Sequence, residues 1–140
     1  MIQMIRQDKS YDNETLNNLI YEYNVEHFPK DLAGRYEQIC IVLKNEEGKL
    51  LGGITGDVCW NWVEIHVLFL DKSIRNKGYG TKLLAEIERI AIEKQCDFLK
   101  VDTLSFQALG FYQKNGYEIF GSIDNVGRHF THYYLRKELN

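Results

Sequence analysis

The sequence predicts an α/β protein of the α+β mixed-sheet type, with helices on both faces of the sheet. Several segments read as strands, two read as amphipathic helices, and a glycine-rich turn joins a strongly apolar strand to one of these helices. The expected order is β-α-β-β-β-α-β-α-β-β. Helical crossovers between strands normally give parallel neighbours, so the sheet should be mixed.

The N-terminal third predicts one strand and one helix. Residues 1–6 can form a first strand, and residues 11–27 have the spacing of an amphipathic helix. The apolar positions of that helix, which should pack on the sheet, are Leu16, Leu19, Ile20 and Tyr23. The segment that continues to Arg35 is expected to be a loop, and Pro29 is consistent with the end of the helix.

The middle of the chain predicts a β-meander followed by a helix. Residues 38–44 and 50–58 flank a polar stretch with Gly48, which suits a hairpin turn. Residues 62–70 form a third long strand, and residues 81–94 form an amphipathic helix. The face of this helix that should be buried consists of Leu83, Leu84, Ile87, Ile90 and Ala91.

The last third predicts a strand, a short helix and two closing strands. These are residues 98–103, 106–115, 117–123 and 129–137. No repeat or low-complexity linker interrupts the chain, so residues 1–140 are expected to form a single domain.

Composition restricts the classes of function. A chain with 44% hydrophobic and 26% charged residues is typical of a globular domain, and it has no apolar run of about 18 residues and no secretory signal. We therefore expect a cytoplasmic protein. The net charge of −3 argues against general binding to nucleic acid or membrane. Neither the cysteines nor the histidines have the spacing of a zinc site, so we expect no metal and buried free thiols at Cys40, Cys59 and Cys96.

The glycine turn carries the most specific chemistry, and it spans Arg75-Asn76-Lys77-Gly78-Tyr79-Gly80-Thr81. Glycines let backbone N–H groups converge, a helix N-terminus adds partial positive charge, and two cations supply full charge. The turn therefore suits a pyrophosphate. It could also be only a tight connection. A dinucleotide fingerprint is absent because Leu83 stands where its third glycine would be, and the P-loop ending is absent too.

Three motifs in order resemble the GNAT N-acetyltransferase superfamily. They are Leu68-Phe69-Leu70, Arg75-x-x-Gly78-x-Gly80 and Ala108-x-x-Phe111-Tyr112-x-Lys114-x-Gly116-Tyr117. The resemblance covers about the last two-thirds of the chain, and the N-terminal third matches only in its order of elements. It implies the GNAT acyl-CoA N-acyltransferase fold with splayed central strands and acetyl-CoA as the acetyl donor.

The resemblance also implies the residues of the donor site. Backbone amides from Lys77 to Thr81 would hold the pyrophosphate, and backbone groups of the strand end would bind the pantetheine arm like an added strand. The cofactor-binding set is Leu68, Phe69, Leu70, Arg75, Asn76, Lys77, Gly78, Tyr79, Gly80, Thr81, Ser105, Ala108 and Tyr112. Ser105 stands where the family often has asparagine, and it could instead be the N-cap of the following helix.

Proton transfer is needed because only a neutral amine attacks a thioester. Strict alternation along residues 62–70 would place Glu64 and His66 on the face of Leu68. The resemblance makes Glu64 a candidate base, and His66 is a second candidate because the ordinary pKa of histidine, near about 6.5, suits a base. Four strand residues span about 13 Å, so without a bulge Glu64 would act through water. Glu64 could also be a solvent-facing strand residue, and His66 a packed or hydrogen-bonded one.

Tyr112 matches the general-acid tyrosine of the family and would protonate the departing thiolate. The alternative is an ordinary core aromatic. We expect an N-acetyltransferase in which the amine of a small molecule attacks acetyl-CoA directly in a ternary complex. A protein or peptide amine, or a non-catalytic acyl-CoA sensor, remains an alternative. An acceptor pocket or a homodimer contact could involve Trp60, Trp62, Phe130, Tyr133 and Tyr134.

Overall fold

The computed structural model describes residues 1–139 and divides into two compact units, the first being Met1–Arg35. This unit contains one helix, α1 (Asn13–Val25), within the range expected. The strand expected at residues 1–6 is absent, because the unit holds no second strand with which its backbone could pair. For the same reason the apolar side chains of α1 pack on no sheet within the unit and stay more than half exposed: Leu16, Leu19, Ile20 and Tyr23.

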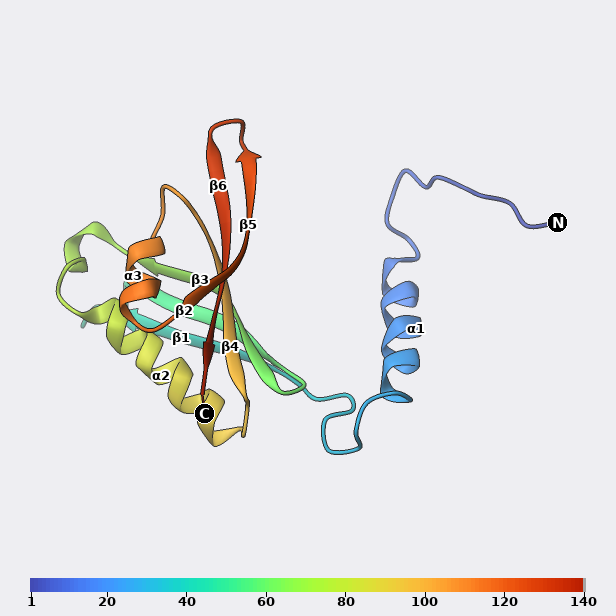
Figure 1. Cartoon of the computed structure of the whole chain (residues 1–140), viewed down its shortest axis with the longest axis horizontal. Coiled ribbons are helices and arrows are strands. Elements are labelled where there is room, and N and C mark those ends of the chain that lie inside the picture. The colour runs from blue at the N-terminus through green and yellow to red at the C-terminus, as the bar shows by residue number, and fades with distance from the viewer. Residues whose placement is uncertain (140) are drawn as a thin grey trace. The chain divides into compact units, whose positions relative to one another are not determined.

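The second unit begins at Tyr36 and is built on one six-stranded sheet (Figure 1). Its strands are β1 (Tyr36–Lys44), β2 (Leu50–Cys59), β3 (Trp62–Leu70), β4 (Phe98–Leu104), β5 (Glu118–Val126) and β6 (Phe130–Glu138). They lie in the order β1-β2-β3-β4-β6-β5, with β3 and β4 parallel and all other neighbours antiparallel. The mixed sheet expected from the sequence is confirmed.

Two helices and a short 3-10 turn complete this unit. They are η1 (Lys72–Ile74), α2 (Tyr79–Glu93) and α3 (Leu109–Lys114). Figure 1 shows α2 and α3 together on one side of the sheet, which we call the near face; the opposite side is the far face. The expected helix at residues 106–115 starts late, because the Gln107 side chain instead accepts a hydrogen bond from the backbone of Leu104 at 2.7 Å.

The near face and α2 form the core. Leu83, Leu84, Ile87 and Ala91 of α2 are buried as expected, whereas Ile90 is only partly buried. The helix can lie close to the sheet because Gly56 has no side chain: a Cβ there would lie 3.2 Å from Cδ1 of Ile87.

The cysteines only partly follow the expectation of buried thiols. Cys96 is buried, Cys59 is intermediate and Cys40 is exposed, because it lies on the edge strand β1 with its side chain away from the core. Among residues 1–139, no helix is long and apolar enough to cross a membrane.

A β-bulge interrupts β3 at His66. Thr55 of β2 pairs with Val67 and Gly56 pairs with Ile65, so His66 is an extra residue without a partner in register. The alternation of side chains therefore reverses at this point. The expectation that Glu64 and Leu68 share a face is wrong: Leu68 pairs with the buried Ile54, while Glu64 pairs with Asp57 on the far face.

Beyond the bulge, β3 and β4 separate. They pair only from Trp62 and Phe98 to Ile65 and Val101, and no later residue of either strand is paired with the other. This split between the central strands is the splay that the sequence led us to expect. The split leaves the last part of β3 unpaired on its β4 side.

Candidate functional site

A groove of about 780 Å³ lies where the split opens on the near face. It is lined by the end of β3, the loop before α2, the first turn of α2 and the segment around α3, through Leu68, Phe69, Leu70, Arg75, Asn76, Gly78, Gly80, Thr81, Phe106, Gln107, Ala108, Gly110, Phe111 and Lys114. Most of the predicted donor-site residues therefore converge on one groove. The predicted residues that do not line it are Lys77, Tyr79, Ser105 and Tyr112.

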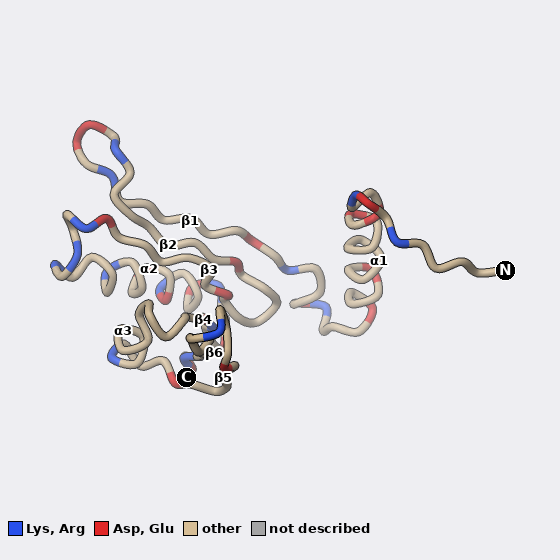
Figure 2. Tube along the Cα trace, turned by 90° about the horizontal axis from the view of Figure 1, so that it is seen from above, with Lys and Arg blue, Asp and Glu red and all other residues tan. Residues whose placement is uncertain are grey.

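The glycine turn leads directly into α2. Gly78 is the residue before the helix and has φ of 87°, a left-handed conformation that glycine adopts without strain. Asn76 is also left-handed, with φ of 61°. The helix therefore begins with its free N–H groups at the groove, where its dipole favours an anion. Figure 2 shows Lys and Arg gathered along the segment before α2.

Arg75 is anchored to the strand it follows. Its Nε donates a hydrogen bond to the carbonyl oxygen of Leu70 at 2.8 Å, and its guanidinium lies over the Phe69 ring, 5.6 Å from the centroid. These two contacts fix the cation at the wall of the groove. The Leu70 carbonyl already has a partner, so a ligand would have to use other backbone groups of the strand end.

The first turn of α2 lies close to α3. A Cβ on Gly80 would lie 3.2 Å from Cζ of Phe111 and 3.6 Å from Cδ1 of Leu70. Gly80 therefore permits this contact between the two walls of the groove.

Ser105 is not the N-cap of α3. That position belongs to Ala108, which makes no side-chain cap. The Ser105 hydroxyl instead accepts a hydrogen bond from the backbone N–H of Thr131 at 3.1 Å, and the Ser105 N–H donates to the Thr131 carbonyl at 2.8 Å. Ser105 therefore fastens the end of β4 to β6, and sequence alone could not show this pairing.

Tyr112 is buried on the core side of α3, with 5% of its surface exposed. Its ring packs between those of Phe111 and Tyr117, with centroids 5.4 and 5.8 Å away. Burial, and next the negative charge of Asp102, raise the pKa of Tyr112 to about 12. The phenol therefore keeps its proton at neutral pH.

Two carboxylates on the far face are paired with cationic or basic groups. Glu64 Oε1 lies 3.1 Å from Nζ of Lys100, and Asp57 Oδ2 lies 2.6 Å from Nε2 of His66. His66, the bulge residue, is thus hydrogen-bonded rather than packed in the core. Glu64 keeps its other oxygen, Oε2, for a further contact.

Asp102 and His132 join the same face, and sequence reasoning missed both. Asp102 Oδ1 lies 2.9 Å from Nε2 of His132, although 30 residues separate them in the chain. Each strand also holds other polar residues, so in sequence both residues suggest only a solvent-facing position. The register between β4 and β6 brings them together.

The expected aromatic pocket lies partly elsewhere. Trp62 stacks on Phe98 at 5.6 Å between centroids and contacts Trp60 at 5.4 Å, beside the paired part of β3 rather than the groove. Trp62 Nε1 is the buried side-chain polar atom without a hydrogen-bond partner within residues 1–139.

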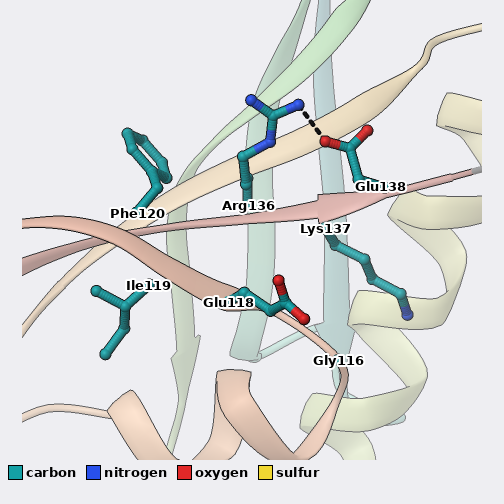
Figure 3. Close-up of a pocket in the computed structure, with 7 residues that line it drawn as sticks. All are labelled: Gly116, Glu118, Ile119, Phe120, Arg136, Lys137 and Glu138. Atoms are coloured by element: carbon teal, nitrogen blue, oxygen red, sulfur yellow. Dashed lines mark hydrogen bonds and ion pairs between the residues drawn. The ribbon is translucent and has the colours of Figure 1, made fainter.

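A second, smaller hollow of about 340 Å³ lies over β5 and β6 (Figure 3). Arg136 forms an ion pair with Glu138 there, and its guanidinium lies 4.4 Å from the centroid of Phe98. Lys137 points to the other side of β6, toward α2, and binds Glu88 at 3.0 Å. No predicted site residue lines this hollow.

Comparison with known proteins identifies the class. The family model described as Acetyltransferase (GNAT) family matches residues 6–117. Blasticidin-S acetyltransferase from Streptomyces morookaense is 40% identical over 95 residues, which is 67% of this chain and 70% of that protein.

Solved structures agree in fold. An acetyltransferase from Bacillus cereus ATCC 14579 superposes with a TM-score of 0.90 and 35% identity, covering 98% of each chain. An aminoglycoside 6'-N-acetyltransferase complexed with coenzyme A has the same fold, with a TM-score of 0.64 at 17% identity, over 100% of this chain and 98% of that one.

The fold and the groove thus define a GNAT-type acyltransferase. The chain belongs to the GNAT family of acetyltransferases, because the family model covers most of it. The resemblance noted in the sequence is confirmed.

Proposed function

We propose that this protein transfers the acetyl group of acetyl-CoA to the primary amine of a small molecule, by direct attack in a ternary complex. The observation that carries the proposal is the groove, in which the N-terminus of α2 and the anchored Arg75 meet the separated end of β3. A pyrophosphate fits the helix N-terminus, and an extended arm fits a strand end that has no neighbour on its β4 side.

The chemistry follows from this placement. The thioester would lie toward the split, and an amine arriving there attacks its carbon to form a C–N bond. Backbone N–H groups at the separated strand would stabilise the oxyanion. The C–S bond then breaks, and in this proposal Tyr112 gives its proton to the thiolate.

Glu64 is the proposed base for the first proton of the acceptor ammonium. It lies on the far face near the last β3–β4 pairs, and Lys100 contacts only its Oε1. The bulge places it across the sheet from Leu68, so a direct approach to the thioester is replaced by transfer through water.

A small-molecule acceptor is supported by the relatives. The one named above acts on blasticidin S by its name, and another neighbour in fold is an aminoglycoside acetyltransferase. A peptide or protein acceptor would need a surface for its backbone, and in this proposal the donor occupies the described groove.

The test combines binding with turnover. Calorimetry should show that the full chain binds acetyl-CoA, and release of CoA should be measured with blasticidin S, an aminoglycoside, spermidine and a lysine peptide. Turnover with one of the first three acceptors is the expected result. Turnover with the peptide alone would favour a protein acceptor.

Binding without any turnover would favour a non-catalytic sensor. A folded chain that failed to bind acetyl-CoA would contradict the whole proposal.

A further inference from the structure

His132 is held between two groups on the far face. Its Nε2 lies 2.9 Å from Oδ1 of Asp102, and its Nδ1 lies 3.3 Å from the hydroxyl of Tyr134. A carboxylate only accepts, so the neutral ring carries its proton on Nε2 and accepts the Tyr134 hydrogen at Nδ1. The two rings also stack, with centroids 4.5 Å apart. The imidazole is therefore fixed in orientation and tautomer.

This cluster lies at the split. The last paired residue of β4 is Val101, opposite Ile65, and Asp102 is the next residue. The Asp102 side chain is 46% exposed and that of His132 is 26% exposed, so both can be reached by a small molecule. The groove lies on the near face, and the cluster lies on the far face, where β3 and β4 cease to pair.

Asp102 also acts on Tyr112. After burial, the Asp102 charge is the second cause that raises the pKa of the Tyr112 phenol. A proton on His132 would form an ion pair with Asp102 and offset that charge. Proton uptake at His132 would therefore make Tyr112 a better proton donor.

His132 contacts one charged group in the described part of the chain. The ionisable groups on the elements around it are Lys100 and Asp102 of β4, Glu118 and Asp124 of β5, Tyr133, Tyr134, Arg136, Lys137 and Glu138 of β6, and Tyr112 and Lys114 of α3. Arg136 pairs with Glu138, and Lys137 pairs with Glu88. Lys100 is paired with Glu64, and Asp124 accepts a hydrogen bond from Thr131. Asp102 is thus the charged partner of His132.

Resting on the function proposed above, we propose that Tyr134, His132 and Asp102 form a proton relay that takes the second proton from the acceptor nitrogen. An ammonium loses two protons on becoming an amide, and Glu64 with water takes only the first. After the C–N bond forms, the nitrogen carries a positive charge. Its proton passes to the Tyr134 oxygen while the Tyr134 hydrogen passes to Nδ1 of His132.

The step balances. The C–S bond breaks with its electron pair on sulfur, and Tyr112 protonates the thiolate. Glu64 and His132 each return one proton to solvent and Tyr112 regains one. One proton is released per turnover, as the conversion of an ammonium and a thioester into an amide and a thiol requires. Asp102 links the two events, because it contacts the imidazole and its charge acts on the phenol.

The kinetic test compares His132→Gln and Asp102→Asn with His129→Gln, which alters a histidine in the exposed β5–β6 turn. With any acceptor that the wild type acetylates in the panel above, the first two variants should lose about 100-fold in kcat. Their KM for acetyl-CoA should not change. The control should behave as the wild type. If His132→Gln does not fold, Tyr134→Phe keeps the stacked ring and should also lower kcat.

A titration that needs no acceptor gives an independent readout. Tyrosinate absorbance should show a lower Tyr112 pKa in Asp102→Asn than in the wild type, with Tyr112→Phe identifying the signal. Full kcat in a folded His132→Gln or Tyr134→Phe would overturn the relay and leave the acetyltransferase function intact. If no acceptor turned over, the function itself would fail, and an unchanged Tyr112 pKa in Asp102→Asn would overturn the relay as well.

Discussion

Ile65 and Leu68 point to the same face of β3 although an odd number of positions separates them. The extra residue, His66, causes this, since it advances the strand without using a partner on β2. The donor-side residue Leu68 and the far-face residue Glu64 are therefore kept apart by the sheet itself. Gly56 permits the bulge to close against its neighbour.

Replacing Gly56 should destabilise the protein. A Cβ there would lie 2.5 Å from the carbonyl oxygen of Glu64 and 3.2 Å from Ile87. Overpacking of this kind costs about 1–3 kcal/mol, so Gly56→Ala should lower the free energy of unfolding by that amount in urea titration. Gly121→Ala is the matched control, because no atom lies within 4 Å of its Cβ. Equal losses in both variants would contradict the packing argument.

Arg75 should contribute to acetyl-CoA affinity through its hydrogen bond to Leu70 as well as through its charge. Removing a charged hydrogen bond costs about 1.5–3 kcal/mol, so Arg75→Met should weaken acetyl-CoA binding by about tenfold or more in calorimetry. Arg75→Lys keeps the charge but lacks the Nε bond to Leu70, and most of the loss should persist.

Lys72→Met removes a cation from the same loop without touching the groove. It should change affinity little. If Lys72→Met weakened acetyl-CoA binding as much as Arg75→Met, affinity would depend only on net charge.

Tyr112→Phe should separate chemistry from binding. Loss of a general acid lowers kcat by about 100-fold or more, while the dissociation constant of acetyl-CoA should stay within about twofold because the ring remains packed. With a pKa of about 12, the wild-type phenol stays protonated between pH 7 and 10, so Tyr112 should cause no alkaline decline in rate there. A full wild-type kcat in Tyr112→Phe would remove the acid role.

Tyr112 should also govern stability in alkali. Its folded pKa is raised above the ordinary value of 10.0, so its contribution is complete below pH 10 and is lost as pH rises through about 12. At 1.36 kcal/mol per pKa unit, a rise of about two units corresponds to a total loss of about 3 kcal/mol. Urea titrations at pH 10 and 12 should show it in the wild type and not in Tyr112→Phe. An equal fall in unfolding free energy between pH 10 and 12 in both proteins would contradict the assignment of this loss to Tyr112.

Tyr117 and Glu88 tie the end of α3 to α2. The Tyr117 hydroxyl donates to Oε2 of Glu88 at 2.9 Å, and Lys137 binds Oε1 at 3.0 Å. Tyr117→Phe leaves a half-satisfied carboxylate and should cost about 1–2 kcal/mol of unfolding free energy. The free energy lost in Tyr133→Phe, whose ring packs on the same core, should be smaller. The reverse order would show that the Glu88 bond contributes nothing net.

The sequence predicted the second unit well because its patterns are local. The apolar run from Trp62 to Leu70 has the bounds of β3, and the helical spacing of Leu83, Leu84 and Ile87 marks the buried face of α2. The strand at residues 1–6 was wrong, since a strand depends on a partner that local pattern does not reveal.

The candidate site divides in the same way. The groove could be predicted in large part, because many of its lining residues belong to one contiguous stretch from Leu68 to Thr81. The far-face pairs could not, because Glu64 meets Lys100 and Asp102 meets His132 only through strand register. The bulge at His66 is also a property of pairing, and it reversed the face assigned to Glu64. Ser105 was misassigned because its partner, Thr131, lies in another strand.

Because of the single extra residue, His66, side chains before and after it in β3 serve different faces of the sheet. Substitutions at Glu64 and its far-face neighbours alter what approaches from one side, while Leu68 and Leu70 remain on the other. Acceptor preference could then drift under selection, or be redesigned in the laboratory, without re-engineering the recognition of the donor.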